Sequence, residues 1–454
     1  MKNTHATHAT QTTPASSSGS RSSRPIASAI CVSLAMFVGV TALAQGPLTP
    51  PPGAPAPAMK TLLQIEPRTD LQSTPPAAGV NTGDASYHFI INQPGSYYLS
   101  ANLGVTRPNG IQINAEGVTL HLSGFEISRT SGTGGHAIEI VPTAHRTRIG
   151  HGAIKGFAYG VRSLEGVTGG FADASGLDDL AVGGCPVVGI LVGDGATLEA
   201  CRVRDCGGGI NTSTGCALTN CTATRNTGTG MTIESGSSAV NCVASANGGS
   251  GIILSGTGSV LRGCVANSNQ GSYGIFASQN ANLTECTASN NTSSAATSAG
   301  ISAGTGSVLT HCTASFNFST AALTSTTGMG FTLGSGSMIR GCVASENKGN
   351  GIRVSENCAV RDNQCNGNGR DAGIVGTGAG VHATGSDNRI EGNNVTNNDR
   401  GIDVDAAGNL IIKNSASGNT GSNYSVVVGN FLGTVVATEA AMNASTNSNS
   451  NISF

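Results

Sequence analysis

Aromatic and charged residues are scarce in this chain of 454 residues. It has no Trp, aromatic residues make up 4% of it, and only 11% of its residues are charged. No stretch combines clustered Lys and Arg with interleaved aromatic side chains, so nothing is present to neutralise phosphates or to stack on bases. These absences exclude nucleic acid as a partner.

Glycine and small polar residues are abundant instead. The chain has 66 Gly, and Asn, Ser and Thr are frequent from residue 200 onward. This composition favours tight turns and stacked polar side chains over helices. Hydrophobic residues still make up 38% of the chain, mostly Val, Ile, Leu and Ala at regular positions, so a long, thin core can be buried.

The N-terminus has the pattern of an export signal. Basic residues precede an apolar run over residues 26–43, and the tripeptide 42–44 fits the small-x-small rule for cleavage. An uncleaved membrane anchor is the alternative, because the run is close to the minimum for spanning a bilayer. We predict a signal peptide over residues 1–44, an exported protein (secreted, periplasmic or on the cell surface), no membrane contact beyond this leader, and a Pro-rich linker over residues 45–80.

A unit of 20–22 residues recurs through most of the chain, with insertions that lengthen some copies. Its first position is Cys or Asn, a small or apolar residue follows two positions later, and Asn follows at the fifth position in nine of ten copies. Each copy also has a Gly followed by alternating apolar residues, as in Ile252-x-Leu254, which is the period of a strand with one buried face. The first positions are Cys201, Cys221, Cys242, Cys264, Cys286, Cys312, Cys342, Asn363, Asn393 and Asn414.

Other repeat architectures do not fit this unit. It is too short for a four-stranded propeller blade, lacks the helical half of ankyrin or tetratricopeptide units, and does not show the frame of a leucine-rich repeat. A single-stranded all-β parallel β-helix remains, with three short strands per coil over residues 81–430 and a C-terminal cap and disordered tail over residues 431–454. Coils ~4.8 Å apart would stack like positions into ladders. Stacked Asn side chains would satisfy one another, and tolerance of left-handed turns is a second reason for Asn.

Units such as Cys264-Val-Ala-Asn-Ser-Asn269 and Asn393-Asn-Val-Thr-Asn-Asn398 give the chain a resemblance to a known group. It resembles the right-handed parallel β-helix repeat proteins of the pectate-lyase-like superfamily, in particular secreted bacterial members. The resemblance covers residues 85–430 and implies a right-handed solenoid. Relatives with known roles include polysaccharide lyases and hydrolases, adhesins, epimerases and a periplasmic copper-maturation factor, so the resemblance specifies the fold and not the activity.

The cysteines form no CxxC pair, and most of them share one position of the repeat. We therefore expect inward-facing, inert packing in place of a metal or redox site. Stacked Cβ atoms ~4.8 Å apart lie beyond the usual separation for a disulfide, which predicts mostly free thiols.

Gly150-His151-Gly152 looks like one fragment of the polygalacturonase signature. Paired carboxylates are needed beside such a histidine to cleave a glycosidic bond. Here Asp178 and Asp179 follow the histidine instead of preceding it, and no Asn-Thr-Asp motif is present. Chance or turn chemistry is the alternative explanation.

A second candidate group lies just before the first position of four successive units. Arg262, Glu285, His311 and Arg340 are expected to form an outward polar stripe that could supply the base of a lyase. Solvated charge and ion pairs between coils are the alternative.

A candidate metal site lies near the C-terminal end of the repeats. Asp403 and Asp405 flank inward Val404 and are expected to face solvent together, where their carboxylates could bind Ca²⁺. No other cofactor is evident from the sequence.

Insertions after Asn291, Asn317 and Asn368 all fall at the same corner of the repeat. Their uncharged Ser/Thr-rich sequences suit neutral sugar hydroxyls, and neutral growth of a loop is the alternative. We expect a secreted or surface-exposed β-helix that binds polysaccharide or a cell-surface glycan, or acts as an extracellular scaffold or adhesin. The competing hypothesis is a polysaccharide lyase or a glycoside hydrolase.

Overall fold

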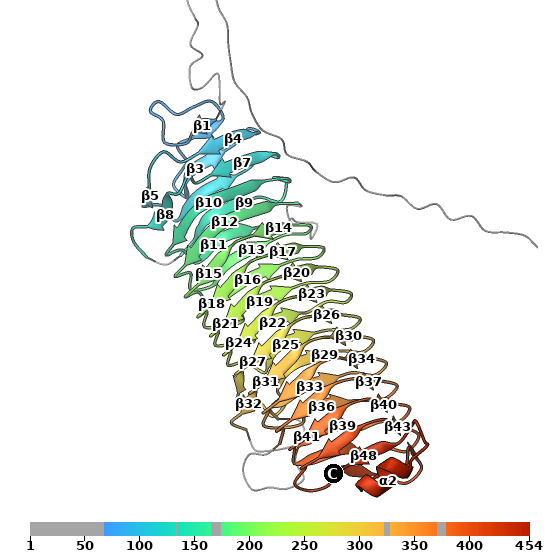
Figure 1. Cartoon of the computed structure of the whole chain (residues 1–454). Helices are drawn as coiled ribbons and strands as arrows, with labels where there is room; N and C mark the ends of the chain where they lie inside the picture. Colours follow the sequence, from blue (N-terminus) through green and yellow to red (C-terminus); the bar gives the residue numbers. More distant parts are fainter. Residues whose placement is uncertain (1–67, 133, 165–173, 322–326, 370–377) are drawn as a thin grey trace, which may run out of the picture. The chain divides into compact units, whose positions relative to one another are not determined.

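The structure is a computed structural model that describes residues 68–132, 134–164, 174–321, 327–369 and 378–454 (Figure 1). The signal peptide predicted over residues 1–44 and most of the predicted linker lie outside these ranges. Within the described ranges, no helix has the length and apolar character needed to cross a membrane.

Each regular coil contributes three short strands, two to a 30-stranded sheet and one to a 16-stranded sheet. The strands of successive coils pair in parallel (Figure 1). Among the described residues, β2 and β3 are an antiparallel exception at the N-terminal end. The predicted fold class, an all-β right-handed parallel β-helix with three strands per coil, is confirmed.

The first column of the 30-stranded sheet contains β1 (Thr69–Asp70), β4 (Gly95–Tyr98), β7 (Val118–His121), β10 (Arg148–Lys155), β12 (Gly176–Gly183), β14 (Thr197–Glu199), β17 (Ala217–Thr219), β20 (Ser238–Val240), β23 (Val260–Arg262), β26 (Asn282–Thr284), β30 (Val308–Thr310), β34 (Met338–Arg340), β37 (Ala359–Arg361), β40 (Arg389–Glu391), β43 (Leu410–Ile412) and β46 (Phe431–Leu432). The second column contains β5 (Leu103–Val105), β8 (Glu126–Arg129), β15 (Arg202–Arg204), β18 (Thr222–Thr224), β21 (Val243–Ser245), β24 (Val265–Asn267), β27 (Thr287–Ser289), β31 (Thr313–Ser315), β35 (Val343–Ser345), β38 (Gln364–Asn366), β41 (Asn394–Thr396), β44 (Ser415–Ser417), β47 (Val435–Val436) and β48 (Asn451–Ser453). β10 and β12 are long enough to pair in both columns.

The 16-stranded sheet contains β2 (Val80–Asn81), β3 (Tyr87–Ile91), β6 (Asn109–Ile113), β9 (His136–Ile140), β11 (Tyr159–Ser163), β13 (Val188–Val192), β16 (Gly208–Thr212), β19 (Met231–Ile233), β22 (Ile252–Leu254), β25 (Tyr273–Ala277), β29 (Ala299–Ala303), β33 (Met329–Leu333), β36 (Ile352–Val354), β39 (Ala379–Ala383), β42 (Arg400–Val404) and β45 (Tyr424–Val426). β28 (Thr292–Ser293) and β32 (Phe318–Ser319) form a separate parallel pair. The helix α2 (Glu439–Ala444) lies near the C-terminus.

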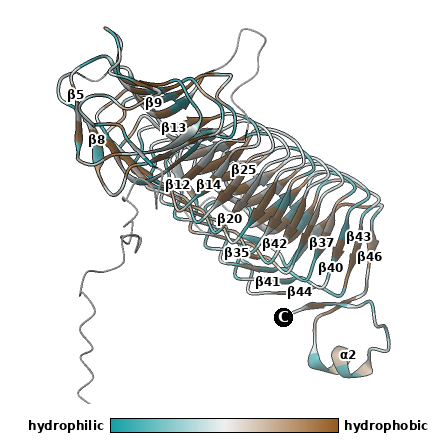
Figure 2. Ribbon diagram, turned by 90° about the horizontal axis from the view of Figure 1, so that it is seen from above, coloured by the Kyte–Doolittle hydropathy of each residue, from teal (hydrophilic) through white to brown (hydrophobic). Residues whose placement is uncertain are grey.

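The core consists of the inward positions of these strands. In β22, Ile252 and Leu254 are fully buried while Ile253 between them is half-buried, as alternation predicts. Figure 2 shows the coils stacked on one another with hydrophobic residues along their strands. The periodic apolar positions of the sequence are therefore the core of the stack.

The predicted Asn ladder is a continuous hydrogen-bonded column. The backbone N–H and the side-chain Nδ2 of Asn269 both donate to Oδ1 of Asn291 one coil further on, each at 3.0 Å. Nδ2 of Asn269 also donates to the carbonyl oxygen of Ala244 at 3.0 Å. Each buried Asn thus links three coils, which explains why Asn recurs at this position.

Left-handed turn geometry falls one residue before each rung of the ladder. Asn290 has φ +54° and Asn397 has φ +57°, whereas the rung residues Asn291 and Asn398 are not in that region. The turn residue directs the next backbone N–H inward, away from the sheet, and the rung side chain of the neighbouring coil accepts it. The hydrogen-bonding explanation of the ladder is confirmed. The left-handed turn is made by the residue before each rung and not by the rung Asn itself.

Cysteine occupies rungs of the same kind. The backbone N–H of Cys312 donates to Sγ of Cys342 at 3.3 Å, and that of Cys342 donates to Oδ1 of Asn363 at 2.9 Å, so thiol and amide are equivalent acceptors along one column. All twelve cysteines of the described residues are buried and free of disulfides. The predicted inward-facing packing is confirmed.

Both ends of the stack differ from expectation. Thr69–Asp70 pairs with β4 and Leu71 is buried, so the fold begins before residue 81 and the predicted linker over residues 45–80 is too long. At the other end, Asn451–Ser453 pairs with β44, and Oδ1 of Asn451 accepts from the backbone N–H of Asn414 at 3.0 Å. A C-terminal cap and a disordered tail were predicted over residues 431–454. The disorder is wrong for residues 451–453, because they form a strand that contains the final rung of an Asn ladder.

Candidate functional site

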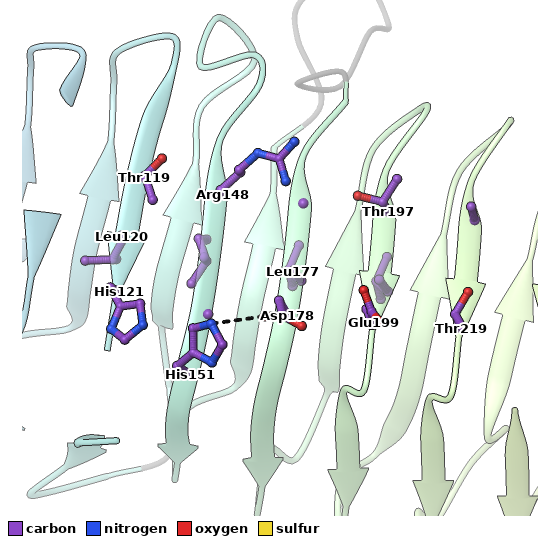
Figure 3. A pocket seen from close by; sticks show the side chains of 15 residues that line it. Thr119, Leu120, His121, Arg148, His151, Leu177, Asp178, Thr197, Glu199 and Thr219 are labelled. Atoms are coloured by element: carbon purple, nitrogen blue, oxygen red, sulfur yellow. Dashed lines mark ion pairs between the residues drawn. The ribbon is translucent and has the colours of Figure 1, made fainter. Parts of the chain in front are cut away.

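A groove with a volume of about 430 Å³ crosses the first column of the 30-stranded sheet (Figure 3). It is lined from five successive strands, β7, β10, β12, β14 and β17, so it runs across the coils along the direction in which they stack. Its lining residues are Thr119, Leu120, His121, Arg148, Ile149, Gly150, His151, Gly176, Leu177, Asp178, Thr197, Leu198, Glu199, Ala217 and Thr219.

Two glycines open the groove. Gly150 lies in register between His121 and Asp178 on the neighbouring strands, and Gly176 lies between Arg148 and Thr197. Because outward positions of like register stack above one another, a missing side chain leaves a gap bordered by the side chains on either side. The groove is this gap.

His151 follows Gly150 at a left-handed turn, with φ +59°. Its Nε2 lies 3.0 Å from Oδ2 of Asp178 and its Nδ1 lies 3.7 Å from Oδ2 of Asp179. All three side chains are about half exposed, at 46%, 49% and 47%. The carboxylates of one coil therefore orient the imidazole of the preceding coil toward the groove.

His121 extends this arrangement to the next strand. Its ring centroid lies 4.5 Å from that of His151, with the rings tilted by 32°. Its Nδ1 accepts a hydrogen bond from the backbone N–H of Ser123 at 3.0 Å, so in the neutral ring the proton is on Nε2. The groove thus holds two imidazoles whose orientations are fixed by different partners.

Two carboxylates line the groove on adjacent strands. Asp178 and Glu199 occupy the same register on the adjacent strands β12 and β14, where neighbouring backbones are ~4.8 Å apart. Asp179 points to the edge of the groove and pairs with Arg202 Nη2 at 2.8 Å. Acid, base and hydroxyl groups are therefore gathered on one surface that is open to solvent.

The sequence placed only part of this site. His151, Asp178 and Asp179 come together as one cluster although 27 residues separate His151 from Asp178. His121 and Glu199 were not predicted as site residues. Glu199 lies two residues before the first position Cys201, but the coils of His121, His151 and Asp178 do not carry the Cys/Asn signal that would align them with it. Alignment of those coils by their inward apolar residues was the signal that could have found them.

The predicted outward stripe is a set of surface ion pairs. Arg262 Nε lies 3.5 Å from Glu285 Oε2, and Arg340 Nε lies 3.1 Å from Oδ2 of Asp362. All four side chains are more than half exposed, and His311 is exposed as well. The ion-pair interpretation fits Arg262, Glu285 and Arg340, and none of the four predicted residues lines the groove.

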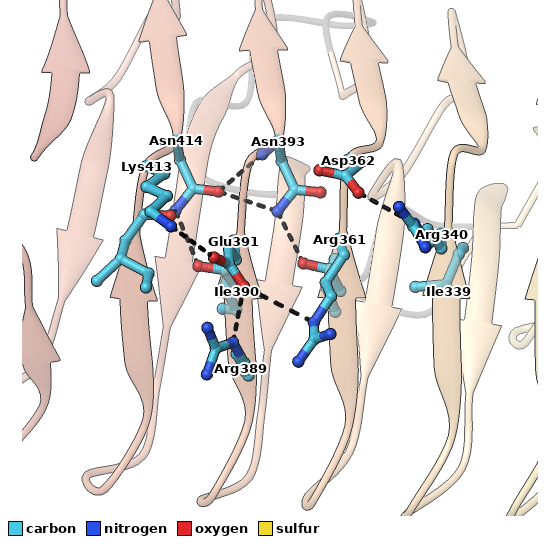
Figure 4. Close-up of polar contacts among 12 residues, drawn as sticks. Ile339, Arg340, Arg361, Asp362, Arg389, Ile390, Glu391, Asn393, Lys413 and Asn414 are labelled. Carbon is cyan, nitrogen blue, oxygen red and sulfur yellow. Dashed lines mark hydrogen bonds and ion pairs between the residues drawn. The ribbon is translucent and has the colours of Figure 1, made fainter. Parts of the chain in front are cut away.

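Glu391 gathers the densest set of such pairs (Figure 4). Its carboxylate lies 2.7 Å from Arg389 Nε, 3.2 Å from Lys413 Nζ and 3.8 Å from Arg361 Nε. The hydrogen bond from Arg389, together with Lys413, lowers the pKa of Glu391 to about 2.

The candidate metal residues do not both face solvent. Asp405 is exposed, but the Asp403 side chain is only 3% exposed and pairs with Arg400 Nη1 at 2.7 Å. The prediction that both carboxylates face solvent together is therefore wrong for Asp403, because the neighbouring side chains His382 and Arg400 lie against it. His382, which was not predicted, lies between the two carboxylates and is 5% exposed.

The insertions form local β-structure where they are described. Thr292–Ser293 and Phe318–Ser319 pair with each other, and Ser293 and Ser319 are buried. Residues 322–326 and 370–377, which belong to the longer insertions, lie outside the described residues. Sugar binding at this corner stays a prediction.

Comparison with known proteins identifies the architecture. The family model described as "Right handed beta helix region" matches residues 109–266, 165–318 and 250–420. Among curated proteins, none matches the chain.

Some solved structures are similar to the chain at low identity. The A-module of mannuronan C-5 epimerase AlgE6 from Azotobacter vinelandii is 15% identical, with 80% of this chain and 91% of that chain covered and a TM-score of 0.42. The Dettilon tailspike protein is 14% identical over 78% of this chain and 62% of that chain, with a TM-score of 0.32. Pectate lyase Pel9A is 15% identical over 69% and 74%, with a TM-score of 0.24.

Proposed function

Since the chain belongs to the right-handed β-helix family, whose coils stack along one axis, we propose that it binds a linear polysaccharide along the groove of the 30-stranded sheet. The observation that carries this proposal is the groove itself, which crosses five coils and is lined by Thr, His, Asp, Glu and Arg. A polymer of sugars presents hydroxyls at regular intervals, and these groups donate and accept in the same way as the lining side chains.

Arg148 favours a polysaccharide that carries anionic groups. It is exposed and lines the groove, and it has no ion-pair partner among the described residues. Arg202, Arg262 and Arg340 on the same sheet are each paired with a carboxylate. A guanidinium without a carboxylate partner binds carboxylate or sulfate with paired hydrogen bonds, so uronate-containing or sulfated chains are the first ligands to test.

A glycan array with the purified full-length protein tests the binding function. We expect retention of acidic linear polysaccharides and a loss of at least tenfold in affinity for Arg148→Ala. Arg340→Ala is the matched control, because Arg340 pairs with a carboxylate outside the groove. Equal binding by the Arg148 variant and the unchanged protein would contradict the proposal.

Catalysis is the second candidate function, and the contact between His151 and Asp178 favours it. An imidazole held 3.0 Å from a carboxylate can accept and return a proton. Asp178 and Glu199 on adjacent strands are a pair of carboxylates of the kind that cleaves glycosidic bonds. The reaction class would be β-elimination or hydrolysis of the bound polysaccharide.

Turnover assays separate the two functions. Polysaccharides retained on the array are incubated with the protein, and new reducing ends and unsaturated uronates are measured. Turnover that is abolished by Glu199→Gln and by His151→Asn, and unaffected by His311→Ala, supports catalysis. If the protein binds these polysaccharides and neither product forms, the result supports the binding function and contradicts catalysis.

Export is part of the proposal, because a polysaccharide ligand of this kind lies outside the cytoplasm. The apolar run over residues 26–43 supports it. N-terminal sequencing of protein recovered from the periplasm or medium tests it, and a new N-terminus after residue 44 is the expected result.

A further inference from the structure

A second cluster of titratable side chains lies on the other sheet, apart from the groove. His382 on β39 and Asp403 on β42 are directly opposite each other in register, and Asp405 follows two residues after Asp403. One potential ligand atom from each of the three residues lies within 4.8 Å of the others. The three side chains thus meet at one point on the outer face of the 16-stranded sheet.

Burial distinguishes this cluster from ordinary surface charge. His382 and Asp403 are almost completely buried, whereas Asp405 is 55% exposed and opens the cluster to solvent. A buried carboxylate is stable only with close partners. Arg400 supplies one of these, with Nη1 2.7 Å from Oδ2 of Asp403, and it holds that carboxylate beside the imidazole.

The distances fit a small divalent cation. His382 Nε2 lies 2.8 Å from Asp405 Oδ2 and 3.7 Å from Asp403 Oδ2. Ligand atoms of a tetrahedral zinc site, with bonds of about 2.0–2.1 Å, lie about 3.3 Å apart, which is between the two observed separations. Movements of about half an ångström would bring both of these pairs to that separation, and the ligand atoms of the two carboxylates lie within 4.8 Å of each other.

We propose that His382, Asp403 and Asp405 bind Zn²⁺, with the fourth coordination position open to solvent on the side of Asp405. An imidazole nitrogen and carboxylate oxygens are donor types that zinc binds with four-coordinate geometry, whereas Ca²⁺ takes six to eight oxygens. Arg400 is a second-shell partner that orients the carboxylate of Asp403.

Asn350 influences which nitrogen of the His382 imidazole carries the ring proton. Its Oδ1 accepts from the backbone N–H of Ala379 at 2.7 Å, so its Nδ2 faces Nδ1 of His382 at 3.3 Å. In the neutral form of the ring, this arrangement places the proton on Nε2, between His382 and Asp405. When Zn²⁺ binds Nε2 of the neutral ring, the ring proton moves from Nε2 to Nδ1, where it faces Nδ2 of Asn350. A turn of the Asn350 carboxamide to accept this proton would break its hydrogen bond from Ala379 N–H, so the native Asn350 weakens Zn²⁺ binding.

The role of Asn350 gives a test that a purely structural cluster would not pass. In Asn350→Asp, one carboxylate oxygen can accept from Ala379 N–H while the other accepts from Nδ1–H of His382. We expect this variant to bind Zn²⁺ at least tenfold more tightly, within the range typical of second-shell changes of about 10- to 100-fold. Weaker or unchanged binding would contradict the assigned role of Asn350.

Isothermal titration calorimetry of the metal-free, full-length protein with ZnCl₂ tests the site. We expect one ion per chain and a loss of at least tenfold in affinity for His382→Ala and for Asp405→Asn. Asp405 is exposed and Asn has the same shape, so this variant keeps the fold. His311→Ala, which removes an exposed histidine elsewhere, is expected to bind as the unchanged protein does.

Cobalt distinguishes this site from the buried thiols. Co²⁺ bound by nitrogen and oxygen gives visible absorption without the intense near-ultraviolet band of cobalt–thiolate bonds. A thiolate band, equal Zn²⁺ binding by Asp405→Asn, or binding of CaCl₂ without binding of ZnCl₂ would each overturn the proposal. Glycan binding at the groove is measured on the same variants and is expected to be unchanged.

Discussion

Asn393 and Asn414 lie on neighbouring coils, and both the backbone N–H and the Nδ2 of Asn393 donate to the single Oδ1 of Asn414, at 3.0 and 2.9 Å (Figure 4). Asn393 also donates from Nδ2 to the carbonyl oxygen of Val360 and accepts at its own Oδ1 from the N–H and Nδ2 of Asn363. Removal of one side chain therefore leaves several buried polar groups without partners.

Asn393→Ala is expected to destabilise the stack by about 2–4 kcal/mol, because the donors of Asn363 are left unpaired in a buried site. Asn394→Ala is the matched control, since Asn394 is exposed, and its effect is expected to stay within about 0.5 kcal/mol. Urea denaturation followed by circular dichroism measures both. Equal unfolding midpoints for the two variants would show that the Asn393 hydrogen bonds do not contribute this free energy of unfolding.

The cysteines are expected to be unreactive in the native protein and fully reactive after denaturation. Burial prevents attack by a thiol reagent, and the twelve described cysteines are free of disulfides. Titration with an aromatic disulfide reagent, without prior reduction, measures both states. Reaction of fewer than half of these thiols in denaturant would show that disulfides form in the stack.

Glu391 is expected to contribute a pH-dependent part of the stability. The Arg389 hydrogen bond and Lys413 lower its pKa from 4.5 to about 2 in the folded protein. A depressed carboxyl pKa stabilises the fold in full above the unfolded value, and this contribution is lost as the pH falls from about 4.5 to about 2.

Denaturation of the unchanged protein and of Glu391→Gln at a series of pH values measures this effect. The difference in unfolding midpoint is expected to be largest at neutral pH and to disappear near pH 2. Glu356→Gln, which removes an exposed carboxyl, is the control. A difference that is constant with pH would contradict the ionic origin of the effect.

The two groove glycines are expected to respond differently to alanine. A Cβ on Gly176 would meet Thr197 Oγ1 at 3.4 Å and Arg148 Cγ at 3.5 Å, which are ordinary contacts, so Gly176→Ala keeps the fold and narrows the groove. A Cβ on Gly150 would lie 2.8 Å from the backbone oxygen of Asp178, so Gly150→Ala is expected to cost about 1–3 kcal/mol.

Unfolding and polysaccharide binding are measured together on both glycine variants. Gly176→Ala is expected to unfold as the unchanged protein does and to bind at least tenfold more weakly. Full binding by this variant would place the ligand elsewhere on the molecule.

The coil could be predicted from the sequence because its determinants are local and repeated. The alternation around Ile252 and the recurrence of Asn at a fixed distance from each first position identify strands, turns and rungs without knowledge of distant contacts. A third ladder escaped prediction. Its acceptors change between Cys, Ser and Asn, and Ala281 interrupts it, which conceals the ladder in the sequence. The residues at this position are Cys216, Ser237, Ser259, Ala281, Ser307, Ser337, Cys358, Asn388, Asn409 and Asn430.

The site could be predicted only in part, because its residues come from coils of unequal length. Asp178 follows His151 by 27 residues, and the extra length between β10 and β12 is not marked in the sequence by any turn motif that fixes the register. Asp403 shows the same limit. Alternation along its strand places it outward, but His382 and Arg400 beside it decide whether that outward position meets water.

The amino-acid sequence by itself determined that the chain winds into stacked parallel coils. Buried apolar positions and amide acceptors recur once per coil, and each coil supplies the hydrogen-bond partners of its neighbour. Only the tertiary structure decided which polar side chains meet. Contacts such as His151 with Asp178 depend on the register between neighbouring coils. Insertions change how many residues lie between two coils, so the register is fixed only when the backbone hydrogen bonds between the strands form.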